Sequence, residues 1–138
     1  MRLVLDTNVV ASGLLWGGVP RLLLQAGREG RVELFTSTAM LGELTDILGR
    51  RKFEQKLAAS TFTVDQIVDR YAALATLVRP APVPRIAPDP DDDVVIGTAL
   101  ASKADLLVTG DKPLLTVGDY QGIRLVRISR ALELIAAA

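Results

Sequence analysis

The chain has 138 residues with no cysteine and no histidine, and its 16 basic residues balance 16 acidic ones. This composition excludes disulfides, cysteine or histidine nucleophiles and imidazole metal sites, so any hydrolytic chemistry has to use carboxylates, lysine or a metal ion. A net charge of zero gives no sign of a nucleic-acid binder. The hydrophobic content of 49% is enough for one core.

Four short apolar stretches predict strands, at Leu3–Leu5, Val32–Phe35, Leu106–Thr109 and Ile123–Ile128. Longer segments of helical character separate them, which predicts an α/β fold around a mostly parallel sheet. We expect a single domain over residues 1–138 with an unprocessed N-terminus. No apolar run approaches the roughly 18 residues of a membrane span, and we expect a cytoplasmic protein.

Between these strands, a helix is expected at Val19–Ala26, with Pro20 in its first turn. Ser37 is placed to cap a second helix, and Thr63 a third. The apolar positions of the second helix follow the 3.6-residue period at Met40, Leu41, Leu44, Ile47 and Leu48, with Arg50, Arg51 and Lys52 suited to its C-terminal end. Those of the third are Val64, Ile67, Tyr71, Leu74 and Leu77.

Prolines interrupt regular structure between residues 80 and 90 and predict a crossing loop. Asp89 then serves as N-cap and Pro90 as the first helical residue of a helix over Asp92 to Ser102. Three successive acids follow Pro90, which is more negative charge than capping needs. A divalent cation would relieve their repulsion, so this run favours a metal site.

Two further acids follow predicted strands. Asp6 comes directly after Leu3–Leu5, and Asp111 comes after the stretch that ends in Thr109 and Gly110. Ligands of open parallel sheets bind beyond the carboxyl ends of the strands, so both acids stand where a site is expected. Either one alone is also an ordinary turn or cap residue, but the occurrence of both favours a site.

Glu43 is expected at the edge of the buried stripe of its helix, beside Ile47, whereas Asp46 points away. A boundary glutamate by itself is commonly only solvated. Oxygen ligands without cysteine or histidine select hard ions, so Mg²⁺ or Mn²⁺ is favoured over zinc. Such ions activate water for phosphoryl displacement, which explains how a hydrolase can lack both residue types.

The order and context of these acids resemble the PIN domain family, and more closely its VapC-like toxins. The matching pieces are Leu-Val-Leu-Asp6-Thr7-Asn8, Glu43, Asp89-Pro90-Asp91-Asp92 with Ala99-Leu100-Ala101, and Val108-Thr109-Gly110-Asp111. The resemblance implies a three-layer α/β/α sandwich around a parallel sheet, dependence on Mg²⁺ or Mn²⁺, and endonucleolytic cleavage of RNA. It also implies a small antitoxin partner and a homodimer.

Carried over by position, the resemblance assigns Asp6, Glu43, Asp92 and Asp111 as the catalytic and metal-binding quartet. Asn8 and Thr109 would be supporting polar groups, with Asp89 and Asp93 as further acids beside the quartet. Helix geometry selects Asp92 over Asp93 independently, because Asp92 heads the buried stripe while Asp93 is expected at the rim or in solvent.

Two remaining features and three other functions stay open. Leu14, Leu15 and Trp16 are expected either in the core or in a partner groove, and Arg50, Arg51 and Lys52 either in solvent or against phosphates.

A phosphatase of the haloacid-dehalogenase type would use Asp6 as nucleophile but would want a second acid at Asn8. A phospho-acceptor receiver domain, which could use Lys112, leaves Glu43 without a purpose. The third is a PIN fold without activity that binds RNA.

Overall fold

The computed structural model describes residues 1–138, and its sheet has six strands in the order β3-β2-β1-β4-β6-β5. The strands are β1 (Arg2–Leu5), β2 (Glu33–Thr36), β3 (Thr76–Leu77), β4 (Leu106–Val108), β5 (Asp119–Tyr120) and β6 (Ile123–Val126). Only the hairpin of β5 and β6 is antiparallel. The central strands β1 and β4 run in register, with Leu5 opposite Val108, so the residues that follow them leave the same edge of the sheet.

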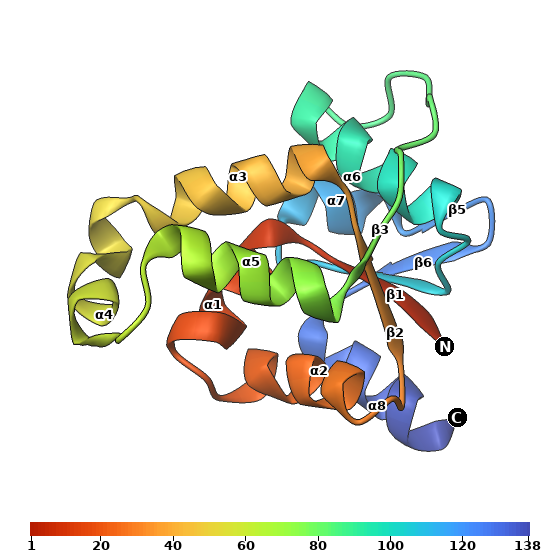
Figure 1. Ribbon diagram of the computed structural model, residues 1–138. Coiled ribbons are helices and arrows are strands. Elements are labelled where there is room, and N and C mark those ends of the chain that lie inside the picture. Colours follow the sequence, from red (N-terminus) through yellow and green to blue (C-terminus); the bar gives the residue numbers. More distant parts are fainter.

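Helices cover both faces of this sheet and complete a three-layer α/β/α fold, as predicted (Figure 1). They are α1 (Thr7–Leu15), α2 (Val19–Arg28), α3 (Thr38–Leu48), α4 (Glu54–Ala59), α5 (Val64–Leu74), α6 (Pro90–Ala101), α7 (Lys112–Val117) and α8 (Ile128–Ala137), with a 3₁₀ turn η1 (Arg51–Phe53). In Figure 1, α1, α2 and α8 lie below the sheet, and α6 and α7 lie above it. Helices α3 and α5 lie side by side.

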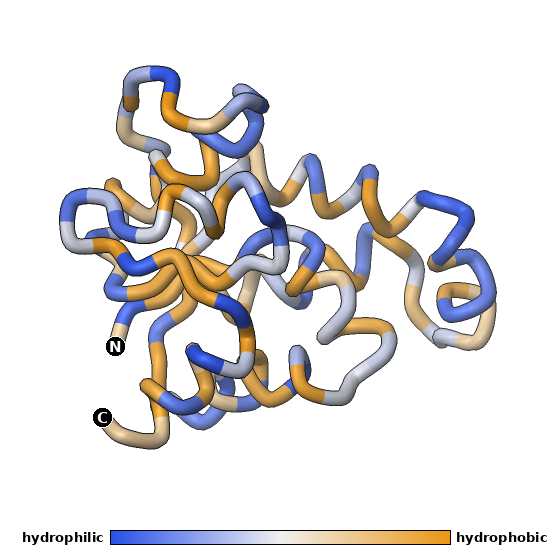
Figure 2. The backbone as a smooth tube through the Cα atoms, turned by 180° about the vertical axis from the view of Figure 1, so that it is seen from behind, coloured by the Kyte–Doolittle hydropathy of each residue, from blue (hydrophilic) through white to orange (hydrophobic).

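The core is divided by the sheet because strand side chains alternate between its faces. In β1, Leu3 and Leu5 join the apolar cluster under α1, α2, α5 and α8, whereas Val4 joins the cluster under α6 and α7. In Figure 2 the central strands are coloured as hydrophobic, and the segments around them are of mixed polarity. No single helix is long and apolar enough to cross a membrane, and α1 and α2 reach that length only as a pair bent by 92°.

The helix starts expected from capping residues are confirmed. The Ser37 hydroxyl accepts a hydrogen bond from the Met40 amide, and Thr63 forms a reciprocal capping box with Gln66. The Asp89 carboxylate accepts from the Asp91 amide at 2.9 Å, with Pro90 in the first turn of α6. These local bonds fix where α3, α5 and α6 begin, and in α6 they also fix the positions of the acids in its first turn.

Several predicted boundaries are wrong, among them those of the helix expected over Asp92 to Ser102, which runs from Pro90 to Ala101. Leu77 is not part of a helix, because α5 ends at Leu74 and Leu77 pairs with Thr36 in β3. The strand expected to reach Ile128 ends at Val126, and Ile128 begins α8. Helix α3 ends at Leu48, so the three basic residues expected at its C-terminal end follow it instead, two of them in η1.

The proline-rich segment crosses from β3 to α6, as expected from its sequence, and is held against that helix. The Ala81 amide donates to the Gly97 carbonyl at 2.9 Å. The Ala81 carbonyl lies so close to Gly97 that a Cβ there would collide with backbone, so only glycine lets the segment pass. The segment thereby covers one side of α6 before the chain enters its acidic first turn.

Candidate active site

Asp6 and Asp111 leave the sheet at the carboxyl ends of its two central strands. The Asp6 amide donates to the Val108 carbonyl at 2.9 Å, which continues the β1–β4 ladder by one residue. Asp6 then caps α1, because its Oδ1 accepts from the Thr7 amide at 2.9 Å. Asp111 stands in the corresponding place before α7.

Thr109 joins these two aspartates. Its hydroxyl donates to Oδ2 of Asp6 at 2.7 Å and accepts from the Asp111 amide at 3.0 Å. Thr109 is fully buried and Asp6 is 7% exposed, so this connection lies inside the protein rather than on its surface. Each oxygen of the Asp6 carboxylate therefore has one fixed donor, and the carboxylate has a defined orientation.

Burial and a neighbouring acid make the charge on Asp6 unfavourable. Loss of solvent is the largest cause that raises the pKa of Asp6, and the charge of Asp111 raises it further. The hydrogen bonds from Thr109 and Thr7 lower the pKa and only partly offset this. The fold thus holds a carboxylate where its own environment disfavours an anion, which is typical of functional sites.

Asp92, in the first turn of α6, belongs to the same group. Burial raises the pKa of Asp92 from its ordinary value of 3.8 to about 7, and the charges of Asp111, Asp6 and Asp89 add to the effect. A side-chain hydrogen bond with Asp111 also contributes. The structure therefore brings Asp92 together with Asp6 and Asp111, although Asp92 is only half-buried and does not head the buried side of α6 as expected.

Glu43 reaches the group from α3. Burial is the largest cause that raises the pKa of Glu43, and the charge of Asp6 is the next. The buried Thr7 hydroxyl lies close enough to Glu43 to lower this pKa. Glu43 also lines a hollow of about 300 Å³ between α3 and the first turn of α6, together with Asp46 and Asp91.

Asp93 lies elsewhere, and its expected place at the rim or in solvent is wrong. It is 7% exposed, and its Oδ1 accepts from the amides of Ile86 and Ala87 at 3.1 and 2.9 Å. Its Oδ2 accepts from Nε of Arg85 at 3.0 Å. These bonds, with that from Ala87 the largest cause, hold the pKa of Asp93 below its usual range. Asp93 therefore fastens the proline-rich segment to α6.

The other expected supporting residues divide in the same way. Asp89 is occupied as the N-cap of α6 and adds its charge to the environment of Asp92. Asn8 is exposed in the first turn of α1, at the rim of the group. Thr7 was not expected to contribute, although it stands between Asp6 and Asn8 in the motif. Its side chain is 98% buried beside Glu43, and nothing in a single sequence separates it from Asn8.

The donors present fit a hard divalent cation. No three carboxylates converge closely enough to ligate one ion together in this arrangement. Mg²⁺ is nevertheless commonly held through one or two carboxylates and several waters. The atoms available as metal ligands are all oxygens, from three carboxyl groups whose pKa values are raised and from the Thr7 hydroxyl. A cation would offset the repulsion that raises these pKa values.

Asp92→Asn is expected to stabilise the metal-free protein, and more so at higher pH. The folded state binds the Asp92 proton more tightly than the unfolded state because the pKa rises from 3.8 to about 7. The stability that this proton contributes is complete below the pKa of Asp92 in the unfolded state and is lost as the pH rises through its pKa in the folded state. Asparagine carries no charge and avoids this loss.

Because Asp92 is partly exposed, solvent screening reduces the gain to about 1 kcal/mol, or about 3 °C in Tm. Thermal unfolding in EDTA from about pH 4 to about pH 8 measures it. Asp91→Asn, which changes the adjacent exposed acid, is the matched control. A difference between Asp92→Asn and the parent that does not grow with pH would contradict this account of the site.

Comparison with known proteins places the chain in a family. Residues 2–113 match the PIN domain family, and the chain belongs to that family. An uncharacterized protein of Methanocaldococcus jannaschii, MJ1680, is 28% identical over 120 residues, which are 86% of this chain and 76% of that protein. The fold is similar to a chain of the crystal structure of VapBC2 from Rickettsia felis bound to a DNA fragment from their promoter. That similarity has a TM-score of 0.59 at 15% identity and covers 92% of this chain and 98% of the other.

Proposed function

We propose that this protein is an endoribonuclease that hydrolyses RNA phosphodiester bonds with Mg²⁺ or Mn²⁺. The observation that carries the proposal is the buried connection through Thr109, which holds Asp6 and Asp111 at one edge of the sheet beside Asp92 and Glu43. PIN family membership supports a nuclease as the class of enzyme. A cluster of oxygen donors without histidine suits phosphoryl displacement better than acyl transfer.

In this proposal Asp6, Glu43, Asp92 and Asp111 are the residues that would hold the metal, one or two of them directly and the others through bound water, because no three of them converge on one ion. A divalent ion bound there supplies activated water and neutralises charge on the phosphate. Thr109 orients the carboxylate of Asp6, and the backbone amide of Asp111 is fixed by the same hydroxyl. The buried Thr7 hydroxyl lies beside Glu43 and would help to orient that carboxyl group.

The residues around the quartet would act through position and charge. Asn8 is exposed beside Asp6 and is available to contact the substrate. Asp89 contributes negative charge near Asp92, and Asp93 keeps the segment before α6 in place. None of these three needs to touch the reacting phosphate.

RNA cleavage by the purified protein tests the proposal. Single-stranded and structured RNA should be cleaved internally with Mg²⁺ or Mn²⁺, and EDTA should abolish cleavage because the carboxylates alone cannot activate water well enough. p-Nitrophenyl phosphate should remain intact, and acetyl phosphate should not label the protein. Persistent cleavage in EDTA would contradict the metal mechanism. Hydrolysis of p-nitrophenyl phosphate would favour a phosphatase, and labelling by acetyl phosphate would favour a receiver domain, although PIN family membership argues against both.

We also propose that the protein is the toxin of a toxin–antitoxin pair, acts in the cytoplasm, forms a homodimer and binds a small antitoxin. The similarity of its fold to a chain of the VapBC2 structure from Rickettsia felis supports this partner. The absence of cysteine is compatible with a reducing compartment. A short gene that lies immediately upstream and overlaps this one would support the pair.

A further inference from the structure

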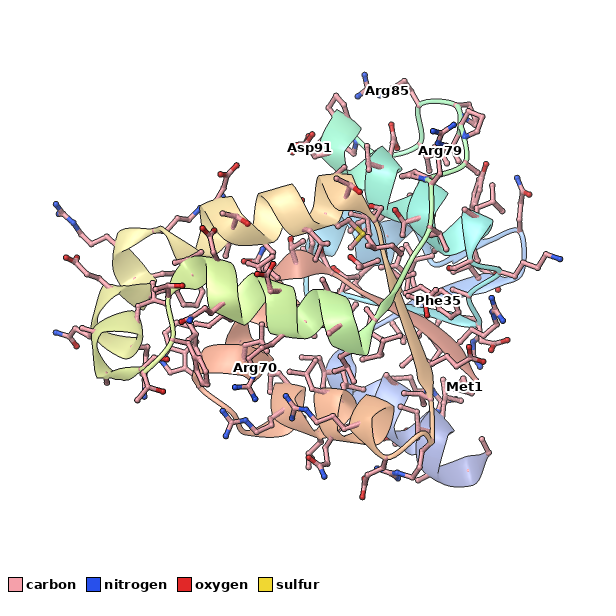
Figure 3. All side chains as sticks on the ribbon, viewed as in Figure 1. Met1, Phe35, Arg70, Arg79, Arg85 and Asp91 are labelled. Carbon is pink, nitrogen blue, oxygen red and sulfur yellow. The ribbon has the colours of Figure 1, made fainter.

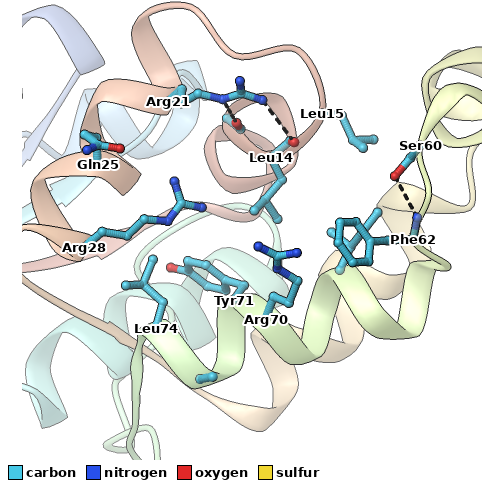
Figure 4. A pocket seen from close by; sticks show the side chains of 13 residues that line it. Leu14, Leu15, Arg21, Gln25, Arg28, Ser60, Phe62, Arg70, Tyr71 and Leu74 are labelled. Carbon is cyan, nitrogen blue, oxygen red and sulfur yellow. Dashed lines mark hydrogen bonds between the residues drawn. The ribbon is translucent and has the colours of Figure 1, made fainter.

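A second cavity lies at the other end of α1 from Asp6. It has a volume of about 680 Å³, lies between α1, α2 and α5, and contains none of the four carboxylates (Figure 4). Helix α1 separates the two places, because Asp6 caps its start whereas Gly13, Leu14 and Leu15 in its last turn line the cavity. We call this cavity the arginine pocket.

Three arginines line the pocket, and no aspartate or glutamate does. Arg21, Arg28 and Arg70 take part in none of the salt bridges of the protein. Arg21 is held in place, because its Nε donates to the Gly13 carbonyl at 3.2 Å. Arg70 lies over the ring of Phe62, 4.4 Å from its centre, and projects from α5 toward α2 (Figure 3). The pocket therefore carries positive charge that the chain itself does not neutralise.

Tyr71 provides an independent sign of a ligand. Its side chain lines the pocket and is only 2% exposed, yet its hydroxyl has no hydrogen-bond partner. In Figure 4 this hydroxyl points into the space between α5 and α2, near Arg28. A buried hydroxyl without a partner is unfavourable and uncommon in folded proteins. A bound acceptor in the pocket would satisfy it.

The surroundings of the pocket favour a protein partner over a nucleic acid. Of the six large hydrophobic side chains that are exposed, four belong to the segments that frame the pocket: Trp16, Val19, Leu22 and Phe62. The lining itself includes Leu14, Leu15, Ile67 and Leu74. Apolar surface of this kind marks protein contacts, whereas nucleic-acid surfaces are more polar. Each aromatic ring also already contacts another side chain, Trp16 with Phe53 and Phe62 with Arg70, which leaves less ring surface on which a base could stack.

We propose that the arginine pocket binds a glutamate or aspartate side chain of a partner protein, on a segment whose neighbouring side chains are apolar. The carboxylate would accept hydrogen bonds from Arg28, Arg70 and the Tyr71 hydroxyl, and the apolar neighbours would cover Leu14, Leu15 and Leu74. Charge-assisted bonds from guanidinium groups are strong and geometrically specific. The proposal draws on the proposed function only for the identity of the partner, not for the chemistry of the pocket.

Two capped peptides test the pocket directly: N-acetyl-Leu-Glu-Leu-amide and its twin with Gln at the centre. In an NMR titration, the Glu peptide should shift the Nε–H signals of Arg28 and Arg70 and bind at least about tenfold more tightly than its twin, since a charged acceptor replaces a neutral one. The double variant Arg28→Gln, Arg70→Gln should lose this preference. Arg124→Gln, an exposed arginine on β6, is the matched control and should keep it.

Tyr71→Phe separates a binding role from a structural one. It should weaken binding of the Glu peptide severalfold while leaving the Tm unchanged or higher, because it removes only an unsatisfied hydroxyl. Equal binding of the two peptides, or no binding, would overturn the proposal. RNA cleavage should be unaffected by the double variant. Loss of cleavage without loss of peptide binding would assign the arginines to RNA instead, whereas a parent protein that cleaves no RNA would refute only the proposed function.

Discussion

Asp6→Asn is expected to lower the rate of RNA cleavage by about a hundredfold or more, since even outer partners of a metal site are worth 10–100-fold. The oxygen of asparagine can still accept from the Thr7 amide, and its NH2 group, in the place of Oδ2, can donate to the Thr109 hydroxyl instead of accepting from it, so both contacts can be kept with one of them reversed. Asparagine carries no charge with which to hold a cation. The loss should therefore be one of chemistry rather than of folding.

Initial rates with Mn²⁺, together with circular dichroism of the same samples, measure this effect. Asp65→Asn is the control, because Asp65 is an exposed acid in the first turn of α5. If Asp6→Asn cleaves RNA at the rate of the parent, Asp6 is only the cap of α1. If Asp6→Asn unfolds, its loss of cleavage says nothing about the charge. Asp6→Glu, which keeps the charge, is then tested in its place.

Asp92→Asn and Asp93→Asn are expected to have opposite effects although the residues are adjacent. Asp92 lies with Asp6 and Asp111, and its loss should reduce cleavage by about a hundredfold. Asp93 is bonded to Arg85, Ile86 and Ala87, and its loss should lower the Tm while changing cleavage severalfold at most. The pH dependence of Asp93 has the opposite sign to that of Asp92. Its stabilising effect is present above its unfolded pKa and is lost as the pH falls through its lowered folded pKa.

Thermal unfolding at neutral pH and cleavage rates for both variants check this pair. The parent and Asp91→Asn serve as references, because Asp91 is exposed in the same turn. An Asp93→Asn protein that keeps its Tm but loses cleavage would make Asp93 the inward ligand. That outcome would contradict the position of Asp92 described above.

Strand ends were the most predictable part of the site. An acid directly after an apolar β run must leave the sheet at the carboxyl end of that strand, and parallel neighbours bring such ends together. Asp6 and Asp111 follow this rule through the β1–β4 register. Helix periodicity likewise placed Glu43 at the edge of the buried side of α3. On α6 it named Asp92 as the head of the buried stripe, whereas Asp93 is the more buried of the two.

Contacts made by loops could not be predicted. Helix geometry gives the direction of Asp93 from the helix axis, but not that residues 85–87 return to cover it. The same limit applies to β3, whose two residues pair with β2 because of where the crossing segment runs. Thr7 was missed because its burial depends on Glu43, which arrives from another element.

The sequence did not predict the arginine pocket, and it left the place of three apolar residues that lie in or near it open. Leu14, Leu15 and Trp16 were expected either in the core or in a partner groove. In the structure Leu14 and Leu15 pack against the core and also line the pocket, whereas Trp16 is exposed and contacts Phe53 with ring centres 4.7 Å apart. Arg21 and Arg28 come from α2 and Arg70 from α5, and no local pattern connects them.

The most direct test of the carboxylate site is the effect of Mn²⁺ on the thermal stability of the parent, Asp6→Asn and Asp111→Asn proteins. A ligand that binds the folded state at a hundredfold excess over its Kd stabilises it by about 2.7 kcal/mol. We expect Mn²⁺ to raise the Tm of the parent clearly and that of either variant much less, with neither variant less stable than the parent in EDTA. An equal rise in all three proteins, or no rise in the parent, would contradict the assignment of these carboxylates as one metal site.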